Sequence, residues 1–276
     1  MVSDRLKKVE RVAAVARRLL LDHACAARQT LGLRPTFDVA VVANSIPKAG
    51  TNLLLDLLVR LGGFCVQPGR TLRGWHDVDV STLRAVETLR RGKVRSAHLP
   101  WHPQLASAYA DGSPRHLLIV RDPRDICVSV LEYVSTLDRI HPAHAYLARD
   151  PDEQRRLLAI IEGVPGVFAG LRDTLTRFAP WLQDPNTLVV RFEHLCTGSA
   201  ADQRAAMAGK IIEYLGLGAR ARPFDIASST QPRTTNLTFR SGRSGDWRTR
   251  FGERALQRSD ELAGELIERF GYARHK

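Results

Sequence analysis

The stretch Phe37-Asp-Val-Ala-Val-Val-Ala43, followed by Asn44-Ser-Ile-Pro-Lys-Ala-Gly-Thr51, decides the fold of this chain. Its first part is short, β-branched and almost wholly apolar, as a central strand of a parallel sheet is. Its second part is a polar loop, and residues 52–61 after it place their leucines on one helical face. The sequence therefore predicts a strand, a loop and a helix in that order.

Two further apolar segments also end in polar motifs. His116-Leu-Leu-Ile-Val120 leads into Arg121-Asp-Pro-Arg-Asp125 and a helix predicted over residues 126–133, and Thr187-Leu-Val-Val190 precedes Arg191-Phe-Glu-His-Leu195. Strands that alternate with helices favour an α/β fold, doubly wound around a central parallel sheet. Ligands of such folds bind at the carboxyl ends of the strands, where each of these polar motifs lies.

The rest of the 276 residues supports a division into two parts. Residues 4–28 predict an amphipathic helix with a basic face, residues 141–185 are mostly helical in pattern, and residues 228–250 form a long Arg-rich stretch that favours a binding role. We predict a basic amphipathic N-terminal helix within residues 1–36 and one α/β domain over residues 37–276. The helix would allow peripheral contact with acidic lipid, although docking on its own domain is the simpler expectation.

The net charge indicates which classes of partner the protein binds, and the length of its apolar segments indicates where it is located. The chain carries 41 Lys and Arg against 29 Asp and Glu, a formal net charge of +12, which indicates an anionic partner such as a polyphosphorylated nucleotide, an acidic glycan, nucleic acid or a membrane surface. No apolar run is long enough for a transmembrane segment, and the N-terminus lacks the apolar region of a signal peptide. We therefore expect a cytoplasmic protein.

The four cysteines, Cys25, Cys65, Cys127 and Cys196, are far apart in the sequence. They form no CxxC pair, so neither a zinc ribbon nor a dithiol redox motif is predicted, and no His, Cys or carboxylate cluster has metal-ligand spacing. Isolated cysteines favour a reducing compartment.

The residues of the loop Pro47-Lys-Ala-Gly-Thr-Asn52 predict an anion-binding site. A loop that enters a helix presents unpaired amides at the positive end of the helix dipole, and here a cation, a glycine and a hydroxyl are added. It is not the usual GxxxxGK[ST] phosphate loop, because Lys48 precedes Gly50. A tight turn without a ligand is the alternative interpretation.

These residues resemble the phosphosulfate loop of the sulfotransferases, cytosolic and bacterial, that use 3′-phosphoadenosine-5′-phosphosulfate (PAPS). That loop reads approximately Tyr-Pro-Lys-Ser-Gly-Thr-Thr-Trp, and Ile46 to Leu53 match it, with Leu53 in place of the adenine-stacking tryptophan. The resemblance implies a P-loop-like three-layer fold, a central parallel sheet flanked by helices, with residues 37–276 as the sulfotransferase domain. It also implies that the 5′-phosphosulfate is bound by Lys48, Ala49, Gly50, Thr51 and Asn52.

Two more segments resemble the part of the family that binds the 3′-phosphate. Residues 119–129 contain a strand-ending Arg121 and, eight positions later, Ser129, which inherit contacts to this phosphate. Phe239-Arg-Ser-Gly-Arg-Ser-Gly-Asp-Trp-Arg248 is similar to the signature Arg-Lys-Gly-x-x-Gly-Asp-Trp-Lys, so the same contacts pass to Arg240, Ser241 and Gly242. Taken alone, the first segment is also compatible with a salt-bridged helix start capped by Asp125, and the second with a loop that binds RNA nonspecifically.

Weaker matches supply the remaining site residues. Arg95-Ser-Ala-His-Leu-Pro100 resembles the family's Lys-Thr-His-Leu-Pro segment, so His98 inherits the role of catalytic base. The family lysine two positions before this histidine is Ser96 here, and the adjacent Arg95 is a candidate to supply its charge. Phe192 takes the place of a tyrosine beside adenine, or is simply a core aromatic residue at a strand end.

The resemblance implies transfer of a sulfuryl group from PAPS to a hydroxyl or amine of an acceptor, with PAP as product and no metal. His98 would take the proton of the acceptor, and Lys48 would stabilise the leaving phosphate. The acceptor is not specified; a glycan or a small natural product fits, and residues such as Trp75, His76, Trp101 and His102 would suit a glycan.

Two alternatives remain at this point, and the oligomeric state is open. One is a nucleotide kinase or NTPase with a variant phosphate loop, for which Glu193 would supply a Mg²⁺ ligand. The other is a basic RNA-binding protein, although the chain lacks the aromatic-rich sheet motif of an RNA-recognition domain, and we expect no nucleic-acid partner.

Overall fold

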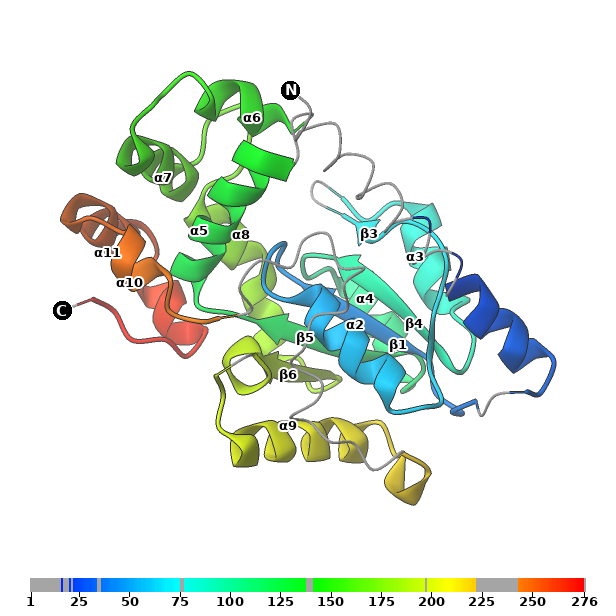
Figure 1. Cartoon of the computed structure of the whole chain (residues 1–276). Helices are drawn as coiled ribbons and strands as arrows, with labels where there is room; N and C mark the ends of the chain where they lie inside the picture. Colours follow the sequence, from blue (N-terminus) through cyan, green and yellow to red (C-terminus); the bar gives the residue numbers. More distant parts are fainter. Residues whose placement is uncertain are drawn as a thin grey trace.

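The computed structural model describes residues 16, 20, 22–33, 36–74, 77–137, 141–196, 198–221 and 243–275. Within them the chain forms a six-stranded sheet in the order β2-β4-β1-β5-β6, with β3 paired to β4 (Figure 1). Every strand pair is parallel. The strands are β1 (Val41–Ser45), β2 (Cys65–Val66), β3 (Leu72–Arg73), β4 (Lys93–His98), β5 (Arg115–Val120) and β6 (Thr187–Arg191). The prediction of an α/β fold with a central parallel sheet is confirmed.

Helices connect the strands and cover both faces of the sheet. In Figure 1, α2 crosses in front of β1 and β4, while α10 and α11 lie beside α7 at one end of the molecule. The helices are α2 (Thr51–Arg60), α3 (Val80–Glu87), α4 (Pro103–Ala110), α5 (Pro123–Glu132), α6 (Pro142–Leu147), α7 (Glu153–Glu162), α8 (Leu171–Phe178), α9 (Ala201–Tyr214), α10 (Trp247–Arg250) and α11 (Glu253–Arg269). A π-helical turn, Tyr133–Leu137, continues α5, and 3₁₀ turns cover Ala179–Gln183, Phe192–His194 and Gly218–Arg220.

The sheet separates two hydrophobic cores, because successive strand residues point to opposite faces. Val41 and Ala43 of β1 pack with α2 and α9, whereas Val42 packs on the other face with residues of α4, α5, α7, α8 and α11. The same alternation continues in β4, where Val94 belongs to the α2 face and Ala97 to the opposite face. This alternation fixes the face of the sheet on which each polar side chain at the strand ends lies.

The first strand begins later than predicted. Phe37 to Ala40 precede the sheet rather than opening it; Phe37 packs against Phe64 with ring centroids 4.8 Å apart, and its amide donates to the carbonyl of Gly63. The strand therefore covers Val41–Ser45 and includes two buried polar residues, Asn44 and Ser45. The predicted helix over residues 126–133 instead begins at Pro123.

Two of the four cysteines are not isolated, contrary to what their spacing suggested. Cys25 and Cys65 form a disulfide, with their Cα atoms 5.8 Å apart, which fastens a helix over residues 22–30 to the β2 edge of the sheet. The Gln29 side chain adds to this attachment by donating to the Gly63 carbonyl over 2.9 Å. Sequence spacing could not reveal a pair 40 residues apart, and the argument for a reducing compartment no longer stands.

Most of the predicted N-terminal helix lies outside the described residues; its part over residues 22–30 docks on its own domain. Within the described part of the chain, no helix is both long and apolar enough to cross a membrane.

Candidate active site

The loop after β1 is shaped by two residues in the left-handed region of backbone conformation. Lys48 has φ 75° and Gly50 has φ 113°, and Gly50 is the N-cap of α2 without any side-chain cap. A Cβ atom at Gly50 would lie 2.6 Å from the Phe192 ring, so only glycine fits without movement of the ring. The first turn of α2 is thus left open to an anion, as its dipole favours.

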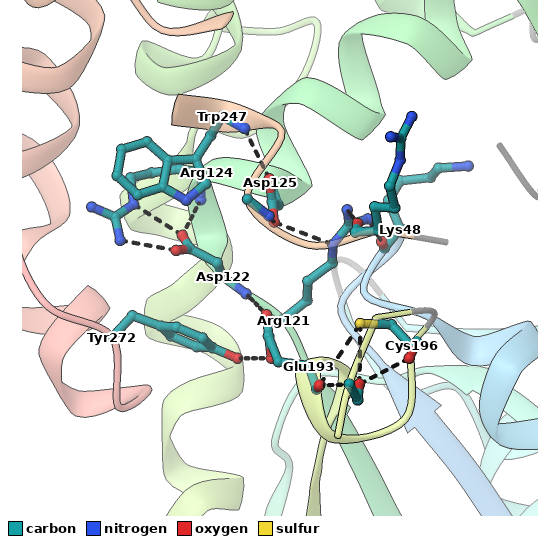
Figure 2. A network of polar contacts seen from close by, with 12 residues as sticks. Lys48, Arg121, Asp122, Arg124, Asp125, Glu193, Cys196, Trp247 and Tyr272 are labelled. Carbon is teal, nitrogen blue, oxygen red and sulfur yellow. Dashed lines mark hydrogen bonds and ion pairs between the residues drawn. The ribbon is translucent and has the colours of Figure 1, made fainter. Parts of the chain in front are cut away.

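Lys48 extends from this loop to the end of α5. Its Nζ lies 4.0 Å from the centroid of the Tyr133 ring, a cation–π contact, at the residue where α5 changes to π-helical geometry. Figure 2 shows the Lys48 backbone next to the Arg121 guanidinium, with Arg121 coming from the end of β5 and Lys48 from the loop after β1. The loop after β1 therefore faces the start and the end of α5 together.

Arg121, at the end of β5, connects three segments that are far apart in the sequence. The residue is 7% exposed, and its side chain donates to the Arg243 carbonyl over 2.9 Å and more weakly to the Lys48 carbonyl over 3.5 Å. Its guanidinium also lies over the Phe192 ring, 4.5 Å from the centroid. The buried Phe192 thus supports both Gly50 and Arg121, as a core aromatic residue would.

The start of α5 is capped by Asp122 and not by Asp125 (Figure 2). Asp122 accepts from the Arg124 amide over 3.0 Å and pairs with the Arg124 guanidinium over 2.9 Å, so the salt-bridged helix start is also correct. Proline at the first helical position, Pro123, places the cap on the residue before it.

Asp125 has another function: it anchors the C-terminal segment. Its carboxylate accepts from the amides of Gly245 over 2.7 Å and Trp247 over 3.0 Å, and its Oδ2 lies 3.8 Å from the Nε of Arg121. Burial raises the pKa of Asp125, while Arg121 and the two amides oppose that rise. Arg124 stacks on the Trp247 ring at 3.8 Å and holds the same segment from its other side.

Glu193 completes this network at the end of β6. One carboxylate oxygen accepts from the Asp122 amide over 2.9 Å, and the other accepts from the Tyr272 hydroxyl over 2.8 Å. Burial and Glu193 raise the pKa of Tyr272, so that this hydroxyl keeps its proton. Both Glu193 oxygens are thus hydrogen-bonded within the protein, and the residue connects β6 to the start of α5 and to the C-terminal segment.

His98 lies at the end of β4, beside the phosphosulfate-like loop. Its Nδ1 lies 3.0 Å from the Ser45 carbonyl and 3.2 Å from the Ser45 hydroxyl, which in turn lies 2.5 Å from the Thr51 hydroxyl. A carbonyl only accepts, so Nδ1 carries the proton and Nε2 keeps its lone pair. Burial, followed by the charges of Arg73 and Lys48, lowers the pKa of His98 to about 4, and the imidazole is neutral at pH 7.

Arg95 does not supply charge to His98, contrary to the expectation from its position. Its side chain donates to the Pro68 carbonyl over 2.7 Å, and as a neighbour of Ser96 in the strand it points to the opposite face of the sheet from His98. Ser96 lies on the same face as His98 and bonds the Thr71 hydroxyl over 3.0 Å. The arginine that faces His98 is Arg73, its register partner on β3.

The structure brings together most of the predicted site residues that it describes. Lys48, Ala49, Gly50, Thr51 and Asn52 form one loop and helix start, Arg121 and Phe192 adjoin it, and His98 reaches it through Ser45. Ser129 lies on α5, partly exposed, eight residues after Arg121.

Other predicted residues are elsewhere or outside the described part. Arg240, Ser241 and Gly242 lie outside it, although the adjacent Arg243 contacts Arg121, and Trp75 and His76 are outside it as well. Trp101 packs edge-on against the buried Trp181, 6.4 Å between ring centroids.

Sequence reasoning missed three residues of this region: Ser45, Arg73 and Asp125. Ser45 offered a signal, because a hydroxyl at the end of a buried strand beside an anion loop needs a partner. Arg73 and Asp125 offered none, since their partners lie 25 and 120 residues away in the sequence.

Comparison with known proteins agrees with the fold and the site. The family profile described as the sulfotransferase domain matches residues 38–271. The chain is 26% identical over 279 residues to the glycolipid sulfotransferase of Mycobacterium tuberculosis, in the H37Ra and H37Rv strains, covering 82% of this chain and 85% of that protein.

Solved structures show the same fold. Mouse sulfotransferase SULT7A1 complexed with PAP superposes with a TM-score of 0.60 at 19% identity, covering 85% of this chain and 86% of that one. Retinol dehydratase in a complex with retinol and PAP superposes with a TM-score of 0.51 at 15% identity, covering 85% and 83%. The match over residues 38–271 shows that the chain belongs to the sulfotransferase domain family and is a sulfotransferase.

Proposed function

We propose that this sulfotransferase moves a sulfuryl group from PAPS to a hydroxyl of a carbohydrate acceptor. The observation that carries the proposal is the convergence of Lys48, Arg121 and His98 on one end of the sheet, around an uncapped helix start. The name of the mycobacterial relative, a glycolipid sulfotransferase, supports a sugar hydroxyl as acceptor.

The residues fit a nucleotide that carries phosphate groups at both ends. The first turn of α2, with Lys48, suits the 5′-phosphosulfate, because amides and an ammonium stabilise a tetrahedral anion. Arg121 suits the 3′-phosphate, since its guanidinium is held by backbone carbonyls that a phosphate can replace as acceptors. Arg240, Ser241 and Gly242 would complete this end of the site, as proposed from the sequence.

His98 acts as the general base in this proposal. Its Nε2 removes the proton of the acceptor hydroxyl while the acceptor oxygen forms its bond to sulfur and the bond from sulfur to the phosphate oxygen breaks. Donation from Nδ1 to the Ser45 carbonyl fixes the tautomer and the orientation of the ring. A base that is neutral at pH 7 is available at every turnover.

Lys48 stabilises the phosphate that leaves with the electron pair of the broken bond. Its side chain starts in the loop, and its Nζ lies 4.0 Å from the centroid of the Tyr133 ring, so its charge is next to the loop that would hold the leaving phosphate. Ser129 and Phe192 keep their proposed positions beside the 3′-phosphate and the adenine, with no part in the proton transfer.

Calorimetry with PAP, AMP and ATP tests the proposal. We expect PAP to bind at micromolar affinity or better, and AMP and ATP to bind at least ten-fold more weakly, because they lack a 3′-phosphate. A preference for ATP would contradict the use of PAPS and favour a kinase. Transfer of ³⁵S from labelled PAPS to sugars, followed by mass spectrometry of the products, then identifies the acceptor and distinguishes a hydroxyl from an amine.

A further inference from the structure

Arg73 on β3 stands directly beside the predicted base on β4. The two strands are parallel, and the register pairs Leu72 with Ala97 and Arg73 with His98. Leu72 and Ala97 belong to the hydrophobic core on the face opposite α2. Because side chains alternate along a strand, Arg73 and His98 both point to the α2 face.

The Arg73 side chain is exposed, and within the described part of the chain no carboxylate or other polar group binds it. The other arginines of this region are engaged: Arg95 donates to the Pro68 carbonyl, and Arg121 donates to the Arg243 carbonyl. The field of Arg73 reaches the imidazole, where it helps to lower the pKa of His98. This guanidinium, next to the predicted base, is therefore accessible to a ligand.

The order of the strands decides which ligand this is. Along the sheet edge β3 comes first, then β4 and then β1, so that His98 lies between Arg73 and the loop that we assign to the donor. Neighbouring strands are about 4.8 Å apart, so Arg73 and His98 are separated by a distance comparable to the width of one sugar ring. The donor occupies the β1 side, and the acceptor must therefore approach from the β3 side.

We propose that Arg73 binds an anionic group of the acceptor, a carboxylate or a sulfate, close to the hydroxyl that becomes sulfated. The acceptor class is thus an acidic carbohydrate rather than a neutral one, and this inference rests on the proposed function. A guanidinium binds carboxylate and sulfate through two parallel hydrogen bonds, which would orient the sugar as well as attract it.

The test compares two glycosides that differ only in one group, 4-nitrophenyl β-D-glucuronide and 4-nitrophenyl β-D-glucoside. Binding of each to the enzyme–PAP complex is measured by calorimetry, and transfer of ³⁵S from PAPS to each is measured in parallel. The variants are Arg73→Gln and Arg73→Lys. Arg70→Gln is the matched control, because it removes the same charge from an exposed position three residues away in the same segment.

We expect the wild-type complex to bind the glucuronide at least ten-fold more tightly than the glucoside. Arg73→Gln should reduce this ratio to about two-fold or less, Arg73→Lys should retain part of it, and Arg70→Gln should retain nearly all of it. PAP affinity should change by less than two-fold in every variant.

A wild-type complex that binds no glucuronide, or that prefers the glucoside, overturns the inference. A preference for the glucuronide that survives Arg73→Gln also overturns it, and so does a loss of PAP affinity in that variant, which would place Arg73 on the donor. Failure of the wild-type protein to bind PAP is a different result: it contradicts the proposed function itself, and is measured before any glycoside is added.

Discussion

The donor side and the acceptor side of this site are built in different ways. On the donor side, Arg121, Asp122 and Asp125 are each at most 7% exposed, and their partners come from the loop after β1, the end of β6, the 243–247 segment and Tyr272 (Figure 2). On the acceptor side, β3 has two residues and its Arg73 is exposed without a partner in the described chain.

This difference between the buried network and the exposed strand indicates which side selects the nucleotide and which selects the acceptor. A cross-linked network holds its groups in place before the ligand arrives, which suits an invariant nucleotide and costs little reorganisation during the reaction. A short edge strand followed by a loop accepts substitutions without disturbing the core, which suits a specificity surface. Mutations on the donor side should therefore change nucleotide affinity, and those on the acceptor side should change the choice of acceptor.

The largest effect on turnover is expected from His98→Ala. Loss of a positioned base should lower turnover by about 10² to 10⁴, with PAP affinity nearly unchanged, since Nδ1 bonds Ser45 and Nε2 is assigned to the acceptor hydroxyl. His144→Ala is the control, because this histidine lies outside the site, with its Nδ1 2.7 Å from the Val134 carbonyl. A variant that keeps more than about a tenth of wild-type turnover would show that His98 is not the base.

The protonation of His98 with pH gives a second test of its role as the base. Because burial, Arg73 and Lys48 lower its pKa to about 4, protonation of the donor-free protein should occur near pH 4 and not near pH 6.5. The base is lost only as the pH falls through that lower value, so the imidazole should not titrate between pH 5 and 8. NMR titration of the His98 ring checks this, and titration near 6.5 would refute the proposed environment. In Arg73→Gln the pKa should be higher.

Arg121→Ala should have the next largest effect. Loss of a hydrogen bond to a charged group costs about 1.5 to 3 kcal/mol, or roughly ten- to a hundred-fold in PAP affinity. Adenosine 5′-phosphosulfate, which lacks the 3′-phosphate, should lose much less. Arg155→Ala, which removes a guanidinium paired at the surface with Asp150, is the control and should change neither affinity. Equal losses for both nucleotides would show that Arg121 does not select the 3′-phosphate.

A smaller loss is expected from Asp125→Asn. Asparagine retains one oxygen that accepts from an amide but loses the second acceptor and the charge that faces Arg121. We expect PAP affinity to fall by about ten-fold through displacement of the 243–247 segment, roughly the value of one hydrogen bond in a charged network. Asp150→Asn is the matched control at an exposed ion pair. Unchanged PAP affinity in Asp125→Asn would mean that the anchored segment does not position the nucleotide.

The smallest effect on turnover is expected from Cys25→Ser. The disulfide closes 40 residues at the edge far from Arg121, so kcat should stay within two-fold of wild type, while the free energy of unfolding falls by up to about 4 kcal/mol on the chain-entropy estimate for a loop of this size. Thermal unfolding with and without dithiothreitol measures this, and the variant should not respond to the reductant. A wild-type melting temperature that also ignores the reductant would show that Cys25 and Cys65 are not bonded in solution.

The strands that carry the donor site were predictable, because each contains an apolar run of at least three residues. β1, β5 and β6 follow this pattern, whereas β4 includes Lys93, Arg95, Ser96 and His98 and does not. Its polar residues are satisfied by Gln29, by carbonyls of residues 67 and 68, by Thr71 and by Ser45, all of which depend on tertiary structure. Strands β2 and β3, with two residues each, are too short to show any periodicity.

The acceptor side was the part that the sequence could not predict. Lys48, Gly50 and Arg121 stand in local motifs, so their position at strand ends follows from the chain itself. Arg73 and His98 lie side by side only because β3 pairs with β4 in this register. A shift of one residue in the register would turn Arg73 to the opposite face of the sheet. Asp125 was assigned as a cap because local patterns are dominated by local interactions, whereas its partners lie 120 and 122 residues away.

The span of the donor network has a consequence for how this protein emerges from the ribosome. The contact of Arg121 with Arg243 cannot form until 122 more residues have been synthesised, and that of Glu193 with Tyr272 requires 79 more. Contacts of such separation form late, after the loops between them have closed. A nascent chain that ends before Trp247 lacks both the anchored 243–247 segment and the α11 residues that complete one core of the sheet. Binding of PAP should thus begin only when the chain has been synthesised through Tyr272.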